Sequence, residues 1–220
     1  MSRDLEEALR ERYEASRSRT PEDRRAIMDS ATDQLRESGL ADRAINVGQV
    51  APTFALPNAA GKIVDSADLL VRGPLVVSFY RGGWCPYCSI ELRMLQTRLD
   101  ELNALGATLV AISPQTPDNS LTTEEKLELS FPVLSDVGNV VARRFGLVFQ
   151  LPEALREVYN GFGIDLPAAN GDDTFELPIP ATFVIDGDGV VAWRHVDPDY
   201  TKRAEPDDVI AAVEALAVRD

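Results

Sequence analysis

The stretch that decides the fold is residues 74–92, which read PLVVSFYRGGWCPYCSIEL. Its first part, residues 74–80, is almost continuously apolar, which predicts a β-strand buried on both faces. Leucines at helical spacing predict a helix over residues 85–105, which Gly106 ends. A second apolar run, residues 107–113, predicts another buried strand. A strand, a long helix and a strand form a right-handed crossover between parallel strands.

The two cysteines of the chain, Cys85 and Cys88, lie where this strand gives way to the helix. Free N–H groups and the positive end of the macrodipole stabilise a thiolate at such a junction. Gly82 and Gly83 let the chain bend, so we expect the sulfur atoms to be accessible to solvent. A spacing of three on a first helical turn places both sulfurs on one side, and Pro86 suits an early helical position. The sequence therefore predicts a pair that cycles between dithiol and disulfide.

Two other interpretations of the pair are weaker. A zinc site needs about four ligands, and the chain offers no third cysteine and one histidine, His195, far along the sequence. Two inert cysteines would normally be buried, which the preceding glycines argue against. A C-x-x-C that follows a strand and opens a helix in a βαβ unit is typical of a redox motif. For His195 itself, a structural or surface role is favoured over that of a base.

The rest of the chain predicts a mixed α/β sandwich preceded by helices. A hairpin is expected around residues 186–189, between two strands, and a last helix follows residue 205. Thr20 is the expected N-cap of the second N-terminal helix, with Pro21 at its first position. We expect a helical N-terminal extension over residues 1–45 and an α/β domain over residues 46–220. The other expected segments are helices at 122–130, 139–145 and 153–159, a strand at 131–135, extended chain over 46–64 and an irregular segment at 147–178.

Composition narrows the class of protein. The net charge of −14 over 220 residues argues against nucleic acid and anionic membranes as partners. No apolar run approaches the roughly 20 residues that span a bilayer. The N-terminus is rich in acidic residues and lacks the apolar stretch of a secretory signal, which predicts a cytoplasmic protein.

Residues 46–218 resemble a peroxiredoxin of the alkyl hydroperoxide reductase/thiol-specific antioxidant superfamily. Residues 47–57, VGQVAPTFALP, are similar to the family's N-terminal signature. Phe79 and Tyr80 followed by residues 88–92, CSIEL, are in register with the family's Phe-Tyr and its peroxidatic Cys-Pro-Thr-Glu-Leu. Residues 135–136 and 183–186 also resemble the corresponding segments of the family. The resemblance implies a thioredoxin-like fold with a mixed central sheet flanked by helices, Cys88 as the peroxidatic cysteine, and a homodimer.

The chain departs from that family at three positions. Cys85 stands where the family has Thr, Arg81 where it has Pro, and Pro180 where it has Arg. The resemblance therefore implies that the usual peroxide-activating groups are absent apart from the cysteine, with Arg81 either a partial substitute or a surface cation at a strand end. The same positions resemble thioredoxin, whose Trp-Cys-x-x-Cys matches Trp84 to Cys88 and whose cis-proline matches Pro180. Pro180 could equally be an ordinary proline at a strand start.

Three functions stay open. The leading one is a thiol-dependent peroxidase without a cofactor, in which Cys88 attacks a hydroperoxide, Cys85 forms the disulfide, and thioredoxin or a similar dithiol reduces it. The second is a thioredoxin-like disulfide oxidoreductase with Cys85 as nucleophile. The third is a non-catalytic interaction module that uses the thiols as a redox switch.

Trp84 is expected to shield the thiols and Tyr87 to be a surface aromatic. Four aromatic side chains of the irregular segment are expected by default to pack in the core, with an acceptor pocket or a subunit contact as the alternatives: Phe149, Tyr159, Phe162 and Phe175.

Overall fold

The computed structural model describes residues 4–217, and its central feature is a five-stranded sheet with the strand order β5-β4-β3-β8-β9. Its strands are β3 (Leu75–Phe79), β4 (Thr108–Ser113), β5 (Val133–Ser135), β8 (Ala181–Ile185) and β9 (Val191–Val196). β3 is parallel to β4, and β4 to β5, whereas β3 and β8, and β8 and β9, are antiparallel. The crossover predicted from residues 74–113 is therefore confirmed.

Both faces of the sheet are covered, as the apolar run of β3 requires. All five residues of β3 are buried. Val76 packs with leucines of the helices on one face, and Val77 packs with phenylalanines on the other face. Because successive side chains of a strand point to opposite faces, an unbroken apolar run fits a strand with two apolar layers around it.

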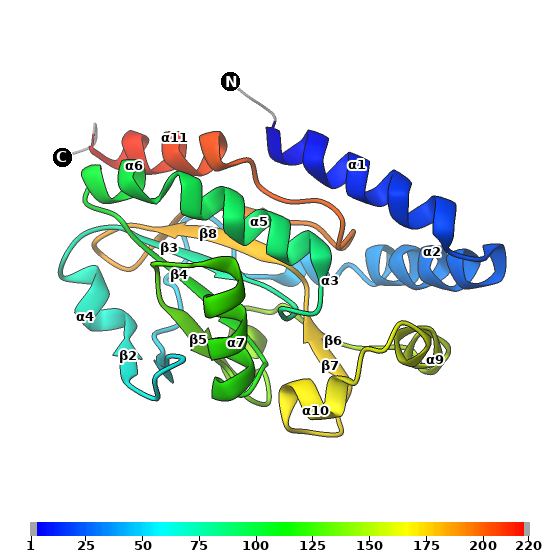
Figure 1. The fold of residues 1–220 in the computed structure, drawn as a ribbon. Coiled ribbons are helices and arrows are strands. Elements are labelled where there is room, and N and C mark those ends of the chain that lie inside the picture. Colours follow the sequence, from blue (N-terminus) through cyan, green and yellow to red (C-terminus); the bar gives the residue numbers. More distant parts are fainter. Residues whose placement is uncertain (1–3, 218–220) are drawn as a thin grey trace.

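The helix that carries the cysteines lies on one face of the sheet beside two others. Figure 1 shows α5 (Pro86–Thr97), α6 (Leu99–Ala104) and α11 (Pro206–Ala217) along that face. The single helix predicted over residues 85–105 is thus two helices. The break falls at Arg98, whose φ of −110° and ψ of 8° leave the helical region. From there its guanidinium binds Glu101, three residues along the chain, and it binds Asp207 of α11 at 2.5 Å. The contact with Asp207 is not contained in any local sequence pattern.

The remaining elements follow the prediction with shifts. The helix expected at 122–130 is α7 (Pro117–Leu127), because Thr116 and Pro117 provide the N-cap and the first helical position. The segment expected to be irregular, 147–178, contains two helices and a two-stranded antiparallel sheet. Its elements are β6 (Val148–Gln150), α9 (Glu153–Gly161), α10 (Leu166–Asn170) and β7 (Glu176–Pro178). The others are β1 (Ala55–Pro57), β2 (Ile63–Asp65), α4 (Ser66–Leu70) and α8 (Val140–Arg144).

The N-terminal helices are α1 (Asp4–Arg19), α2 (Glu22–Glu37) and α3 (Leu40–Arg43). α1 lies beside α5 (Figure 1) and buries Leu5 and Leu9 in the core that α5 shares. Its first N–H groups donate to the carboxylate of Glu205, at 3.4 Å from Leu5 and 2.6 Å from Glu6. α2 packs against α9. The N-terminal helices therefore dock on the rest of the chain through α5 and α9.

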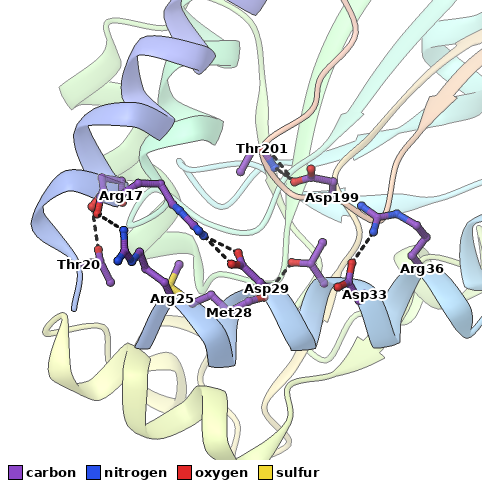
Figure 2. Close-up of polar contacts among 11 residues, drawn as sticks. Arg17, Thr20, Arg25, Met28, Asp29, Asp33, Arg36, Asp199 and Thr201 are labelled. Atoms are coloured by element: carbon purple, nitrogen blue, oxygen red, sulfur yellow. Dashed lines mark hydrogen bonds and ion pairs between the residues drawn. The ribbon is translucent and has the colours of Figure 1, made fainter. Parts of the chain in front are cut away.

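Polar contacts hold α1 and α2 together at their turn, as Figure 2 shows. Arg17 donates to both carboxylate oxygens of Asp29, at 2.6 and 2.7 Å. Thr20 does not cap α2 as expected: its hydroxyl donates back to the carbonyl of Ser16, and Pro21 is the N-cap.

The division of the chain into an extension and a domain at residue 46 stays a prediction. Within residues 4–217, no helix is both long and apolar enough to cross a bilayer.

Candidate active site

The cysteines lie at the N-terminus of α5, as predicted. Cys85 is the N-cap residue, and Pro86 follows in the first turn. The bend before them needs glycine at two positions. Gly82 has a φ of +146°, and a Cβ there would collide with the indole of Trp84. A Cβ on Gly83 would collide with the hydroxyl of Thr123, a residue of α7. The glycines thus admit close packing around the thiols.

The expected exposure of the thiols is wrong. Cys85 is 2 % exposed and Cys88 is 0 % exposed, and both are free thiols. The physical reason is the cover above them: α1, α2 and α9 close over the end of the sheet, and Trp84 packs edge-on against Tyr159 of α9 at 5.6 Å. Buried cysteines are normally inert in apolar surroundings, so the charges around this pair decide its chemistry.

Arg203 is the cation next to Cys88. Its Nη2 donates to the Cys88 sulfur at 3.2 Å, and its Nε donates to the Glu91 carboxylate at 2.6 Å. Its other nitrogen donates to the carbonyls of Tyr200 and Lys202. These contacts fix the orientation of the guanidinium, with one N–H group directed at the sulfur of Cys88. Burial raises the pKa of Glu91 to about 7, although the charge of Arg203 opposes this shift.

Arg81 is the second cation of the site, and it has no carboxylate partner among the described residues. Its side chain is 3 % exposed, so the alternative of a surface cation is wrong. Its guanidinium donates to the Tyr159 hydroxyl and lies over the Tyr200 ring, 4.6 Å from the ring centroid. Its Nε has no hydrogen-bond partner. A buried charge without a counter-ion is costly, so an anion beside Arg81 is favoured.

One thiolate on the cysteine pair supplies that anion. Burial alone would raise the pKa of the Cys85 thiol. A hydrogen bond from the Cys88 side chain and the charges of Arg81 and Arg203 outweigh it and lower this pKa to about 5. Burial and the adjacent Cys85 raise the pKa of Cys88 well above its ordinary value. The pair therefore holds its negative charge on Cys85 and its proton on Cys88 near neutral pH.

A cavity of about 530 Å³ opens above Cys85, whereas Cys88 does not line it. The predicted neighbours Arg81, Trp84, Pro86 and Tyr87 all line this cavity. Tyr87 is buried rather than a surface aromatic. Of the four aromatics of segment 147–178, Tyr159 and Phe162 line the cavity.

Pro180 takes a different place from the one that the thioredoxin resemblance implies. Within residues 4–217 every peptide bond is trans, so Pro180 is not a cis-proline. It lines a second, mostly apolar cavity of about 350 Å³ that shares Arg81, Tyr159 and Tyr200 with the first. The alternative of an ordinary proline preceding a strand fits, because β8 begins at Ala181.

Two functional groups escaped the sequence analysis, Arg203 and Tyr200. The position expected for an activating arginine holds Pro180, and Arg203 reaches the thiol from the loop after β9 instead. One signal was present: Glu91 lies between Cys88 and Leu95 on the inner face of α5, and a buried acid needs a cation. His195 lies on β9, and burial lowers its pKa. Its structural role stays a prediction.

The comparison with known proteins agrees with this architecture. Residues 47–194 match the AhpC/TSA family. The chain belongs to the AhpC/TSA family. A putative peroxiredoxin of Mycobacterium tuberculosis (strain H37Rv) is 30 % identical over 151 residues, which are 68 % of this chain and 85 % of that protein. A putative peroxiredoxin of Buchnera aphidicola is 33 % identical over 100 residues, 46 % of this chain and 63 % of that protein, which is less than two thirds of its length.

The fold is also similar to that of a solved peroxidoxin. The crystal structure of peroxidoxin BcpB from Mycobacterium tuberculosis superposes with a TM-score of 0.64 at 24 % identity, over 78 % of this chain and 98 % of the other. The predicted resemblance to peroxiredoxins and the predicted thioredoxin-like fold class are thereby confirmed. The α1–α3 helices and Arg203 lie outside the residues that match the family.

Proposed function

We propose that the protein is a thiol-dependent peroxidase that reduces hydroperoxides with the Cys85/Cys88 pair. The observation that carries this proposal is a low-pKa thiol at the base of a covered cavity, beside a buried arginine with no carboxylate partner in the described chain. Negative charge develops on the leaving oxygen of a peroxide, and the N–H groups of Arg81 are positioned donors for it. Membership of the AhpC/TSA family supports the same activity.

The chemistry needs only the two thiols, the peroxide and a dithiol. The thiolate forms a bond to one peroxide oxygen, the O–O bond breaks, and the second oxygen leaves as an alcohol or water after taking a proton. The attacking cysteine is then a sulfenic acid. The other thiol attacks its sulfur and releases water, which gives the Cys85–Cys88 disulfide. Thioredoxin or a similar dithiol, itself oxidised to a disulfide, restores the pair.

The geometry favours Cys85 for the first attack, whereas the register with the family assigns it to Cys88. Cys85 lines the cavity and carries the lowered pKa, and Cys88 is completely buried behind it. Treating Cys85→Ser and Cys88→Ser with hydrogen peroxide and a sulfenic-acid trap decides the order. We expect the trapped acid in Cys88→Ser alone. The reverse pattern makes Cys88 the peroxidatic cysteine. No trapped acid in either variant, with no peroxide-dependent turnover of the unaltered protein, contradicts the peroxidase.

The second candidate is a thiol–disulfide oxidoreductase, which a low-pKa first cysteine of a C-x-x-C also favours. Burial of Cys85 under α1, α2 and α9 counts against it, because a protein disulfide must approach the attacking sulfur directly. Reduction of insulin without consumption of peroxide selects this candidate. Slow alkylation of both thiols near neutral pH selects the third, a redox-switched interaction module. The predicted cytoplasmic location and homodimer stay proposals.

A further inference from the structure

The inner face of α1 changes character where it crosses the cavity over Cys85. Leu5, Leu9, Arg12, Ser16 and Arg19 recur at spacings of four and three, so they share one face of the helix. The two leucines are buried in the core, whereas Arg12, Ser16 and Arg19 line the cavity. If the inner face of α1 served only to dock the helix on the core, apolar residues would continue along it. Three positions on this face of α1 are instead polar, and two of them are cationic.

α2 adds a third cation to the mouth of the same cavity. Arg24 lines it from the first turns of α2, with its guanidinium 5.9 Å from the ring centroid of Phe162. Among residues 4–217, neither Arg12, Arg19 nor Arg24 forms an ion pair with a carboxylate. No acidic side chain of the described chain lines this cavity, although acidic residues outnumber basic ones 36 to 22 in the sequence. The cavity is therefore a positive region in an acidic protein.

Donors inside the cavity also lack partners. The buried Nε of Arg81 and the indole Nε1 of Trp84 have no hydrogen-bond acceptor. Buried donors without acceptors are rare, and they point to a ligand that completes them. The aromatic side chains of Tyr87, Tyr159 and Phe162 also line the cavity. The volume of about 530 Å³ lies within the range of small-molecule sites.

From this arrangement we propose that the cavity binds an organic hydroperoxide that carries a carboxylate, with Arg12, Arg19 and Arg24 holding the carboxylate while the peroxide faces Cys85. The proposal rests on the proposed peroxidase function and names its substrate class. The aromatic walls suit a hydrophobic body between the two polar ends.

The test compares cumene hydroperoxide with its para-carboxylate derivative, which differ in one ionised group. The rate constant for oxidation of the reduced full-length protein is measured by stopped-flow fluorescence with each. A partly exposed ion pair contributes a factor of up to about five in affinity. Because more than one of the three arginines contacts the carboxylate, we expect the carboxylate substrate to react about tenfold faster. The variant Arg12→Gln/Arg19→Gln/Arg24→Gln is expected to bring the ratio of the two rates close to one.

A matched control removes three charges elsewhere. Arg10 and Arg36 form exposed ion pairs with acids on their own helices, and Arg93 is exposed; none of them lines the cavity. Arg10→Gln/Arg36→Gln/Arg93→Gln should keep the tenfold preference. A ratio of one in the unaltered protein, or an equal loss in both triple variants, overturns the proposal.

A binding measurement separates this proposal from the peroxidase function. The unreactive 4-isopropylbenzoate is titrated into the reduced protein by calorimetry, with the neutral 4-isopropylbenzamide alongside. Binding of the benzoate that the cavity variant loses supports the carboxylate site even if no hydroperoxide is reduced. Peroxide reduction without binding of the benzoate, and without a preference for the carboxylate substrate, leaves the peroxidase standing and removes the carboxylate site.

Discussion

Replacing Arg203 and Glu91 together by apolar side chains, as Arg203→Met/Glu91→Leu, is expected to raise the pKa of the reactive thiol. The double change is needed because Arg203→Met alone leaves Glu91 buried without a counter-charge, at a cost of about 3–5 kcal/mol. Both side chains of the pair are 1 % exposed. Replacing a buried pair by apolar groups of similar volume is often neutral for stability, so the variant is expected to fold.

The size of the shift follows from the charge of Arg203, which is held beside the cysteine pair with its Nη2 3.2 Å from Cys88 Sγ. On Cys85, the thiol with the lowered pKa, Arg203 acts through its charge. At an effective dielectric constant of about 20, a unit charge about 6–10 Å away contributes about 1.5–3 kcal/mol, and about 1.4 kcal/mol corresponds to one pKa unit. The pKa of the reactive thiol should therefore rise from about 5 by about 1 to 2 units. The thiolate fraction at pH 7 then falls at most about twofold, but at pH 5 it falls about fivefold to fiftyfold.

The assay is the rate of alkylation by iodoacetamide between pH 4 and pH 9, because only the thiolate reacts. Glu91→Gln is the matched control: the pKa of Glu91 is about 7, so its carboxyl is already neutral where the thiol titrates, and the variant keeps Arg203. The thiol pKa should therefore stay near 5 in this variant. A thiol pKa that rises in the double variant and stays unchanged in Glu91→Gln supports the reasoning. A double variant with native near-ultraviolet circular dichroism and a thiol pKa unchanged within about 0.3 units would falsify it.

Three further predictions concern the same site. In the unaltered protein, alkylation should be constant above about pH 6 and fall about tenfold per unit below pH 5, because the Cys85 thiolate, with its pKa of about 5, is protonated there; a midpoint near pH 8.5 contradicts the low pKa. Arg81→Met should slow oxidation by hydrogen peroxide more than alkylation at pH 8, since it removes the donor for the leaving oxygen; equal slowing of both reactions would count against that role. Gly83→Ala should destabilise the protein by about 1–3 kcal/mol, because its Cβ meets the Thr123 hydroxyl. Thermal unfolding measures this change against Gly187→Ala, whose Cβ meets nothing within 4 Å, and equal midpoints would contradict the clash.

Local patterns were sufficient for the framework of the fold and for the position of the thiols. The apolar runs of β3 and β4 and the Pro86 start of α5 follow from strand burial and helix capping. The break at Arg98 was not predicted: the leucine spacing continues across it, and the ion pair of Arg98 with Asp207 joins residues more than a hundred positions apart in the chain. Contacts of this kind depend on the fold itself and leave no periodic signal.

In the candidate site, too, local sequence patterns predicted some features, whereas others depend on contacts between remote parts of the chain. The C-x-x-C motif predicted two adjacent thiols, but their burial comes from α1, α2 and α9, which are remote in sequence. Arg203 reaches Cys88 from a loop with no recognisable motif. Arg81 adjoins the motif, yet its burial depends on Tyr159 and Tyr200. The sequence thus indicated which atoms react, while their acidity and access depend on the tertiary structure.

The short segment after β9 ties the cover of the cavity to the acidity of the thiols. Glu205 receives the first N–H groups of α1, and Arg203, two residues earlier, contacts Cys88. If the reductant is a protein that lifts α1 to reach the disulfide, it would also disturb the backbone that positions Arg203. Access for a large partner and loss of thiolate stabilisation would then occur in one movement, so opening the site would weaken its reactivity toward peroxide while the disulfide is being reduced.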